Sequence, residues 1–288
     1  MNPVFKTLSQ SKDKITDIWV IFPFAGGSYS AFKSWTQLEP NVLPNQSLVL
    51  LATYPGRDQR MREQPLSSIN ELAEQLFDAL LIWRKQTPAA QAATLRLCGH
   101  SMGAQVAFEV CKQFEDHFGP TSPIRQLILS GCHAPHLEGR RKLSHLDDEP
   151  FVDQLIAIGS GSPVLKQHPE LLPVFLPMLR ADFTATEGYL CDIGSSAKLN
   201  MTPCTLVYGE QDPEAWPSEV NAWQAWINTS TQVEVTVCAL QGDHFYITAQ
   251  PQTFIQKVLE LAAAPVTLAN TCTDAHHTAK TIFGEHHG

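Results

Sequence analysis

The chain has 288 residues, of which 43% are hydrophobic, 17% charged and 9% aromatic. This composition supplies enough apolar surface for a large core, which excludes a disordered or fibrous chain. Because 29 acidic residues outnumber 20 basic ones, the net charge is −9, and we expect no nucleic-acid partner. The apolar runs are far shorter than the roughly 20 residues that span a bilayer, and residues 1–14 lack the apolar segment of a secretory signal. We therefore expect a cytoplasmic monomer with no membrane contact.

Short runs rich in Val, Ile and Leu alternate along the chain with longer segments of helical period. Such runs are typical of buried parallel strands, and helices between them imply right-handed crossovers. The pattern predicts an α/β fold with a mostly parallel sheet and helices on both faces. The expected strands are Asp17–Phe24, Ser47–Thr53, Leu95–Gly99, Ile124–Gly131, Pro203–Gly209 and Val233–Leu240, and the expected helices are Ser30–Leu38, Ser68–Lys85, Ser101–His117, Glu214–Trp226 and Pro251–Leu261.

One interval, residues 132–202, interrupts this alternation and contains no strand-like run. Helical segments at Glu149–Ile158 and His168–Tyr189 predict a helical lid insertion, at about residues 140–200, over the catalytic edge of the sheet. Its apolar positions are expected to form an acyl pocket or to hold the lid on the core: Leu155, Ile158, Leu172, Phe175, Leu179 and Phe183. We assign residues 1–263 to one domain and 264–288 to a flexible tail.

The seven cysteines are odd in number and include no Cys-x-x-Cys pair. Several stand in apolar runs, where a reduced thiol packs as a small hydrophobic group. We interpret them as thiols, and we expect neither a metal site nor a protein-bound cofactor.

The pentapeptide from Gly99 to Gly103, Gly-His-Ser-Met-Gly, follows a predicted strand and opens a predicted helix. A serine on such a tight turn needs small residues two positions to either side, because the backbone passes close to its neighbours. The turn also places the serine at a helix N-terminus, where backbone N–H groups favour developing negative charge. Ser101 is therefore the candidate nucleophile.

In sheets with this elbow the nucleophile is followed along the chain by an acid and then by a histidine. His244 is the histidine between the last predicted strand and the closing helix, so it is the candidate base. Asp212 follows the strand before it and is preferred as the orienting acid over Glu210 in the same loop and over Asp243, which adjoins the histidine.

An oxyanion hole requires two N–H groups directed at one oxygen. In this fold one belongs to the residue after the nucleophile, here Met102, and the other to the loop after an early strand. That loop is Phe22–Ser28, in which either Ala25 or Gly26 could offer the N–H.

Together these motifs resemble those of the type II thioesterases, stand-alone α/β-hydrolases that serve nonribosomal peptide and polyketide synthetases. The resemblance covers about residues 17–262. Two positions depart from the usual pattern, because Gln105 stands where an apolar residue is typical and Asp243 where glycine is typical. The segments that carry the resemblance are Phe22–Gly27 (Phe-Pro-Phe-Ala-Gly-Gly), Tyr54–Arg57 (Tyr-Pro-Gly-Arg), Gly99–Ala104, Ala107–Glu109, Gly209–Asp212 and Gly242–Phe245.

The resemblance implies a triad of Ser101, Asp212 and His244, with Ala25 and Met102 as oxyanion donors. It also implies that the enzyme clears acyl groups from the phosphopantetheine thiol of acyl- or peptidyl-carrier domains in an editing role. The same triad would suit a product-releasing or acyl-transferring thioesterase, or a carboxylesterase. A catalytically dead binding module is the alternative from another class, and the complete triad argues against it.

Two short loops hold six of the 20 basic residues and leave the sheet at the same edge as the serine. They are candidates for docking an acidic carrier domain or the phosphate of its arm, and the alternative is that they pair with nearby carboxylates at the surface. The residues are Arg57, Arg60, Arg62, Arg140, Arg141 and Lys142.

Overall fold

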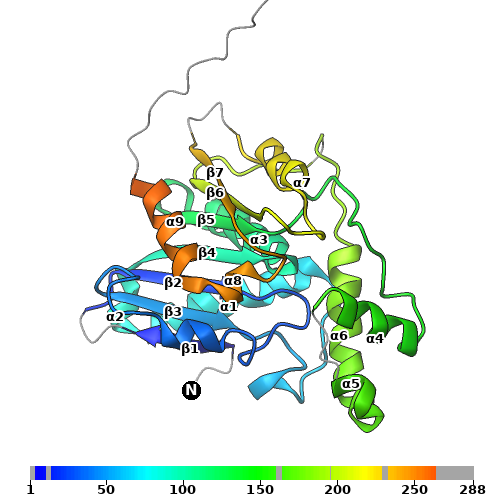
Figure 1. The fold of residues 1–288 in the computed structure, drawn as a ribbon. Helices are drawn as coiled ribbons and strands as arrows, with labels where there is room; N and C mark the ends of the chain where they lie inside the picture. Colours follow the sequence, from blue (N-terminus) through cyan, green and yellow to red (C-terminus); the bar gives the residue numbers. More distant parts are fainter. Residues whose placement is uncertain (1–3, 11–13, 160–163, 195, 229–232, 264–288) are drawn as a thin grey trace, which may run out of the picture.

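The computed structural model describes residues 4–10, 14–159, 164–194, 196–228 and 233–263. Its centre is a seven-stranded sheet in the order β1-β3-β2-β4-β5-β6-β7, in which only the pairing of β1 with β3 is antiparallel (Figure 1). All six predicted strands are confirmed. The strands are β1 (Phe5–Gln10), β2 (Asp17–Phe22), β3 (Ser47–Ala52), β4 (Thr94–His100), β5 (Ile124–Ser130), β6 (Cys204–Gly209) and β7 (Val235–Leu240).

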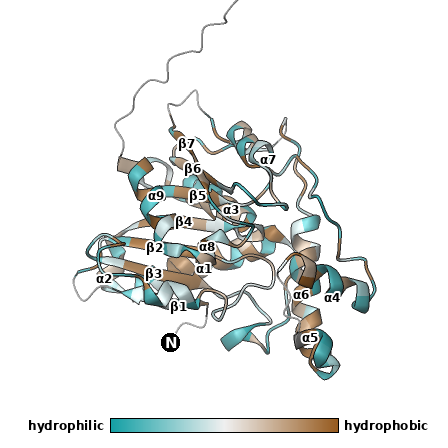
Figure 2. Cartoon of the chain, viewed as in Figure 1, coloured by the Kyte–Doolittle hydropathy of each residue, from teal (hydrophilic) through white to brown (hydrophobic). Residues whose placement is uncertain are grey.

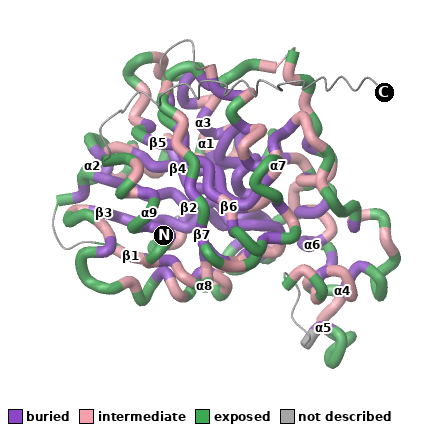
Figure 3. Tube along the Cα trace, turned by 45° about the horizontal axis from the view of Figure 1, so that its top comes forward, coloured by how far each residue is buried: buried purple, intermediate pink, exposed green. Residues whose placement is uncertain are grey.

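Strand β2 shows why the central strands are apolar throughout. Ile18 and Val20 pack into a core on one face of the sheet, whereas Trp19 and Ile21 pack into a second core on the other face. Successive side chains of a strand point to opposite faces, so a strand covered on both sides is hydrophobic at every position. The strands accordingly form the brown, apolar centre of Figure 2 and the buried centre of Figure 3.

Helices cover both faces of this sheet. The first core contains buried residues of α1 (Ile69–Gln86) and α3 (Met102–Phe118), and the second contains those of α8 (Tyr246–Ala249) and α9 (Pro251–Ala263). Figure 1 shows the two pairs on opposite sides of the strands. The shorter helices are η1 (Lys33–Gln37), η2 (Asp58–Arg60), α2 (Pro88–Gln91), η3 (Gly119–Thr121), α7 (Pro217–Asn221) and η5 (Ala222–Trp226).

The insertion between β5 and β6 is helical, as predicted. It contains α4 (Asp148–Ala157), α5 (Val164–Gln167), η4 (Pro169–Leu171) and α6 (Leu172–Glu187), and these elements lie together beside the sheet in Figure 1. Phe151 of α4 packs edge-on against Phe183 of α6, with 5.7 Å between the ring centroids. The guanidinium of Arg180 lies 4.6 Å from the Phe151 ring centroid, so the two helices support each other.

Three details differ from the sequence-based expectations. Strand β1 lies outside the predicted strands, because in residues 5–10 only Phe5 and Leu8 are buried and the others carry polar groups, as fits an edge strand. The segment expected to be a helix from Ser30 to Leu38 forms only the short η1, and the one expected from Glu214 to Trp226 is divided into α7 and η5.

The predicted tail, residues 264–288, lies outside the described residues. Among the helices of the described residues, none is long and apolar enough to cross a bilayer.

Candidate active site

Ser101 lies between the end of β4 and the start of α3, as the elbow motif predicts. Its backbone has φ 55° and ψ −125°, a conformation that costs energy for any residue other than glycine. The turn is held because the Ser101 N–H donates to the carbonyl oxygen of Ser130 on β5, at 2.8 Å. Neighbouring structure therefore fixes the strained serine at the carboxyl edge of the sheet.

The glycines of the motif are required by close backbone contacts. A Cβ at Gly99 would overlap the carbonyl oxygen of Gly103, and a Cβ at Gly103 would overlap that of Phe22 on the neighbouring strand β2. Neither obstacle is the flexible end of a side chain, so neither can move aside without shifting a strand or the helix. The small residues two positions to either side of Ser101 thus permit α3 to start directly against the sheet.

Asp212 and His244 are brought together although 32 residues separate them. His244 Nδ1 donates to Asp212 Oδ2 at 2.8 Å, and both side chains are buried. The other carboxylate oxygen, Asp212 Oδ1, accepts from the backbone N–H groups of Glu214 at 2.8 Å and Ala215 at 3.2 Å. The backbone therefore fixes the carboxylate that orients the imidazole. Because the imidazole proton is on Nδ1, Nε2 is free to accept a proton.

The two competing acids are engaged elsewhere. Glu210 is exposed and its carboxylate contacts the Gln241 side chain. Asp243 Oδ1 accepts from the backbone N–H of Phe245 at 2.9 Å, which closes a local turn. Of the three carboxylates weighed from the sequence, Asp212 is the one in contact with the candidate base.

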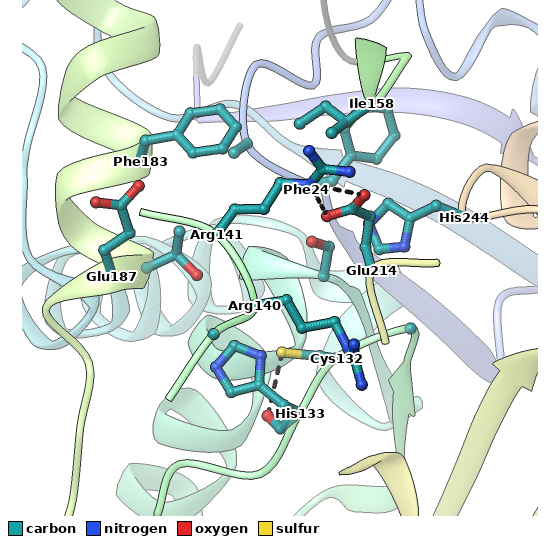
Figure 4. Close-up of a pocket in the computed structure, with 15 residues that line it drawn as sticks. Phe24, Cys132, His133, Arg140, Arg141, Ile158, Phe183, Glu187, Glu214 and His244 are labelled. Carbon is teal, nitrogen blue, oxygen red and sulfur yellow. Dashed lines mark hydrogen bonds and ion pairs between the residues drawn. The ribbon is translucent and has the colours of Figure 1, made fainter. Parts of the chain in front are cut away.

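Ser101, His244 and Ala25 line one cavity of about 90 Å³ at the carboxyl edge of the sheet (Figure 4). No hydrogen bond joins Ser101 Oγ to the His244 ring within the described residues, and such contacts often tighten only when substrate binds. The insertion supplies part of the wall through Ile158 and Phe183. Other lining residues are Phe24, Gly131, Cys132, His133, Gly139, Arg140, Arg141, Thr186, Glu187 and Glu214.

The structure distinguishes Ala25 from Gly26, the two loop residues that the sequence left as alternative oxyanion donors. The Gly26 N–H donates to the buried carboxylate of Asp182 at 2.7 Å and is therefore occupied. Ala25 lines the cavity beside Ser101, and Met102 is the first residue of α3. Ala25 and Met102 thus fit the requirement for one N–H from the loop and one from the helix.

Arg57 and Arg60 are not surface residues, so the prediction that they dock a carrier was wrong. Each is only 3% exposed. Arg57 pairs with Asp182 at 2.6 Å, and Arg60 pairs with Glu63 at 2.5 Å and donates to the Thr53 carbonyl oxygen at 2.8 Å. The sequence could not reveal the first pair, because its members are 125 residues apart.

The other four basic residues are exposed. Arg140 pairs with Glu219 at 3.0 Å and stacks on the Trp216 ring, and Arg141 pairs with Glu214 at 2.9 Å. Lys142 pairs with Glu138 at 2.9 Å. Arg140 and Arg141 both line the catalytic cavity, as Figure 4 shows, whereas Arg62 does not.

The predicted pocket residues of the insertion separate into three groups. Ile158 and Phe183 line the catalytic cavity. Phe175 and Leu179 line a second, mainly apolar cavity of about 460 Å³, which also touches the loops at Gly26 and Arg57. Leu155 is fully buried in the main core and Leu172 packs against that core, so these two hold the insertion on the sheet.

Several cavity residues carried no signal in the sequence. Thr186 donates from Oγ1 to Gln105 Oε1 at 2.8 Å, so the unusual Gln105 is anchored to the insertion. Burial lowers the pKa of His133, and Glu219 opposes this shift.

All six described cysteines are unpaired and five are buried; Cys272 lies outside the described residues. Burial is the main cause of the raised pKa of the Cys132 thiol. A thiol kept protonated in this way packs as a small apolar side chain.

Comparisons with known proteins agree with this geometry. A family model described as a thioesterase domain matches residues 18–261. The probable anguibactin biosynthesis thioesterase AngT of Vibrio anguillarum is 38% identical over 263 residues, which cover 91% of this chain and 98% of AngT. Among solved structures, the type II thioesterase YbtT of the yersiniabactin pathway is 39% identical, with a TM-score of 0.79, over 89% of this chain and 97% of YbtT.

A second solved structure, the thioesterase RedJ of the prodiginine pathway in Streptomyces coelicolor, is 30% identical with a TM-score of 0.71 and covers 88% of either chain. The family model and the AngT match each extend over most of this chain. With the sheet order, the elbow and the buried His–Asp pair, they show that the chain is an enzyme of the α/β-hydrolase fold that belongs to the thioesterase domain family.

Proposed function

We propose that this enzyme hydrolyses acyl thioesters held on the phosphopantetheine arm of acyl- or peptidyl-carrier domains, in an editing role in nonribosomal peptide and polyketide biosynthesis. The observation that carries the proposal is the buried His244–Asp212 pair, whose histidine lines the same cavity as the strained Ser101. The similarity to type II and biosynthetic thioesterases supports the choice of substrate.

In the first half-reaction, Ser101 Oγ attacks the thioester carbonyl carbon while His244 Nε2 takes the hydroxyl proton. The carbonyl oxygen becomes an oxyanion that accepts hydrogen bonds from the Ala25 and Met102 N–H groups. When the C–S bond breaks, the departing sulfur takes the proton from His244 Nε2 and leaves as the phosphopantetheine thiol, and the acyl group stays on Ser101 as an ester. A thiolate is a good leaving group, so protonation by His244 matters less here than in amide hydrolysis.

In the second half-reaction, water attacks the ester carbon and gives its proton to His244 Nε2. The oxyanion forms again at the same N–H groups, the bond to Ser101 Oγ breaks, and the serine regains its proton from the imidazolium. The product is the free carboxylic acid. Asp212 keeps the imidazole in one orientation and stabilises its charged form in both halves.

The test is to load carrier domains with short and long acyl groups and to follow their release by intact-protein mass spectrometry. Wild-type enzyme should return free carrier and carboxylic acid, whereas Ser101→Ala should leave the acyl group in place. Ser218→Ala, at an exposed serine of α7, is the matched control and should retain wild-type turnover. Turnover by Ser101→Ala within tenfold of wild type would exclude the serine mechanism.

The same assay separates the alternatives. An acyl-transferring or cyclising enzyme would yield an acyl-acceptor product or a ring in place of the acid, and a carboxylesterase would prefer the oxygen ester of the same acyl group. A binding module would hold the acylated carrier without turnover and would not react with a fluorophosphonate. We expect covalent labelling of wild type and none of Ser101→Ala.

A further inference from the structure

A carboxylate from the helical insertion reaches the loop of the candidate oxyanion donor. Asp182 on α6 is 1% exposed and accepts three hydrogen bonds: from the Gly26 N–H at 2.7 Å, from Arg57 Nη1 at 2.8 Å and from Arg57 Nη2 at 2.6 Å. The next residue of the same helix, Phe183, lines the catalytic cavity. Helix α6 therefore contacts both the cavity and the loop beside it.

The loop segment that Asp182 contacts is a tight turn, residues 24–27, which we name the oxyanion turn. The Gly27 N–H donates to the Phe24 carbonyl oxygen at 2.8 Å, and Gly26 has φ 75°. These are the features of a type II turn. A type I turn differs by a flip of the central peptide, which would direct the Gly26 N–H to the opposite side. The hydrogen bond to Asp182 thus favours one orientation of that peptide.

Arg57 holds the other end of the same turn. Its Nη1 also donates to the Gly27 carbonyl oxygen at 3.1 Å, and its guanidinium lies 5.0 Å from the Tyr54 ring centroid. The Tyr54 hydroxyl in turn donates to the Pro23 carbonyl oxygen at 3.0 Å. One buried ion pair therefore holds both the peptide group before Gly26 and the peptide group after Gly27, and it joins three segments far apart in the sequence.

The contacts of Asp182 and Arg57 indicate an indirect role of this ion pair in the reaction. Asp182 and Arg57 do not line the catalytic cavity, so neither is placed to touch the reacting atoms. The Gly26 N–H is occupied, whereas Ala25, the neighbouring residue in the turn, faces the cavity. We propose that Asp182 is a positioning residue that acts through Arg57 and the oxyanion turn to hold the Ala25 N–H toward the oxyanion. This inference rests on the proposed serine mechanism.

The placement of Asp182 on α6 has a further consequence. Thr186 and Phe183 on the same helix form part of the cavity wall. Any movement of α6 therefore displaces both this wall of the cavity and the Asp182 carboxylate that holds the oxyanion turn. An enzyme with α6 displaced would keep Ser101 and His244 but would lose the fixed orientation of the Ala25 N–H.

The first test is Asp182→Asn. The amide keeps one acceptor oxygen but loses the charge and places an NH₂ group where the second carboxylate oxygen stood, so the paired contact with Arg57 is lost. We expect kcat for a small soluble thioester to fall about 30- to 100-fold with KM within about threefold, because small displacements of a positioned group cost this much. Arg57→Lys, which keeps the charge but not the two-pronged contact, should give a smaller loss in kcat.

Asp17→Asn is the matched control. Asp17 pairs with Arg96 at 3.1 Å and both are buried, but they lie at the end of β2 opposite to the oxyanion turn. The control should lower the melting temperature as much as Asp182→Asn does while kcat stays within about twofold of wild type. If Asp17→Asn reduced kcat as strongly, the effect would be one of general stability and the proposal would be overturned.

A second measurement isolates the transition state. For a trifluoromethyl ketone analogue, which forms a tetrahedral oxyanion on Ser101, Ki should rise by the same factor by which kcat/KM falls. Affinity for an unreactive amide analogue and the midpoint of the pH–rate profile should not change, because His244 and Asp212 are untouched. An unchanged Ki in folded Asp182→Asn would overturn the positioning role alone, whereas turnover by Ser101→Ala would overturn the serine mechanism itself.

Discussion

His100 Nε2 donates a hydrogen bond to the backbone carbonyl oxygen of His244, with 2.7 Å between the two atoms. A carbonyl can only accept, so the His100 proton is on Nε2, and Nδ1 accepts from the Ser130 hydroxyl at 2.9 Å. The Tyr246 hydroxyl lies 2.6 Å from Ser130 Oγ and 3.0 Å from the Val207 carbonyl oxygen, so its one proton is shared between these two acceptors. The residue before the nucleophile thus ties the elbow to the loop that carries the base.

This network predicts a pH dependence of stability. Burial, and to a smaller extent nearby His244, lowers the pKa of His100 well below its usual value. Below about pH 6.5 the unfolded chain therefore binds a proton that the folded chain does not, and stability is lost as pH falls, by up to about 1.4 kcal/mol per unit. In His100→Gln this contribution is absent. We expect the difference in unfolding free energy between wild type and this variant to be constant above about pH 7.5.

The same difference should shrink steadily between pH 6.5 and pH 5. Urea denaturation at each pH measures it, with the midpoint and slope fitted for both proteins. Parallel curves across this range would show that His100 is not held neutral by the fold.

Asp212→Asn should lower kcat by about 10³- to 10⁴-fold while the fold is retained. The backbone N–H groups that hold Asp212 Oδ1 would still orient the asparagine oxygen, so its amide nitrogen would face His244 Nδ1 and favour the wrong tautomer. Glu210→Gln and Asp243→Asn are the controls, and each should stay within about threefold of wild type. Steady-state rates on one thioester measure all three; a severe loss in Glu210→Gln would require the acid to be reassigned.

The two cavities predict different effects of bulk on acyl-chain preference. Phe183→Trp should shift the preference toward shorter chains, and Phe183→Ala toward longer ones, because Phe183 lines the cavity that contains Ser101. Phe175→Trp, which adds the same bulk to the second cavity, should leave the preference unchanged. The measurement is kcat/KM for a series of acyl chain lengths. A shift with Phe175→Trp instead would place the acyl group in the second cavity.

Arg140 and Arg141 predict a contribution to carrier docking that a small substrate does not detect. Replacing both by Gln should raise KM for an acyl-carrier protein roughly five- to tenfold at low salt and less at high salt. Hydrolysis of a small uncharged thioester should change less than twofold. Lys142→Gln is the control, since Lys142 is exposed but does not line the catalytic cavity. Equal effects on both substrates would show that the arginines act within the pocket and not in docking.

Residues 99–103, Asp212 and His244 could be singled out as candidates from the sequence because local rules govern them. A strained serine between a strand and a helix requires small neighbours, and parallel strands deliver the loops that follow them to one edge of the sheet. Chain order was therefore sufficient to place the acid and the base near the nucleophile, and the 2.8 Å contact between His244 and Asp212 agrees with it. Strand β1 escaped prediction because an edge strand lacks the continuous apolar pattern of the central strands.

The fate of Arg57 shows what only the tertiary structure decided. In the sequence it stands in a polar loop and looks like a surface charge, yet the fold buries it against Asp182 from a helix 125 residues away. The same contact occupies the Gly26 N–H of the loop after β2, which leaves Ala25 as the candidate oxyanion donor of that loop. Composition, periodicity and motif spacing record which side chains a segment must bury or expose locally. They do not show which distant segment will supply the ion-pair partner of a charged residue, because that depends on how the insertion packs against the sheet.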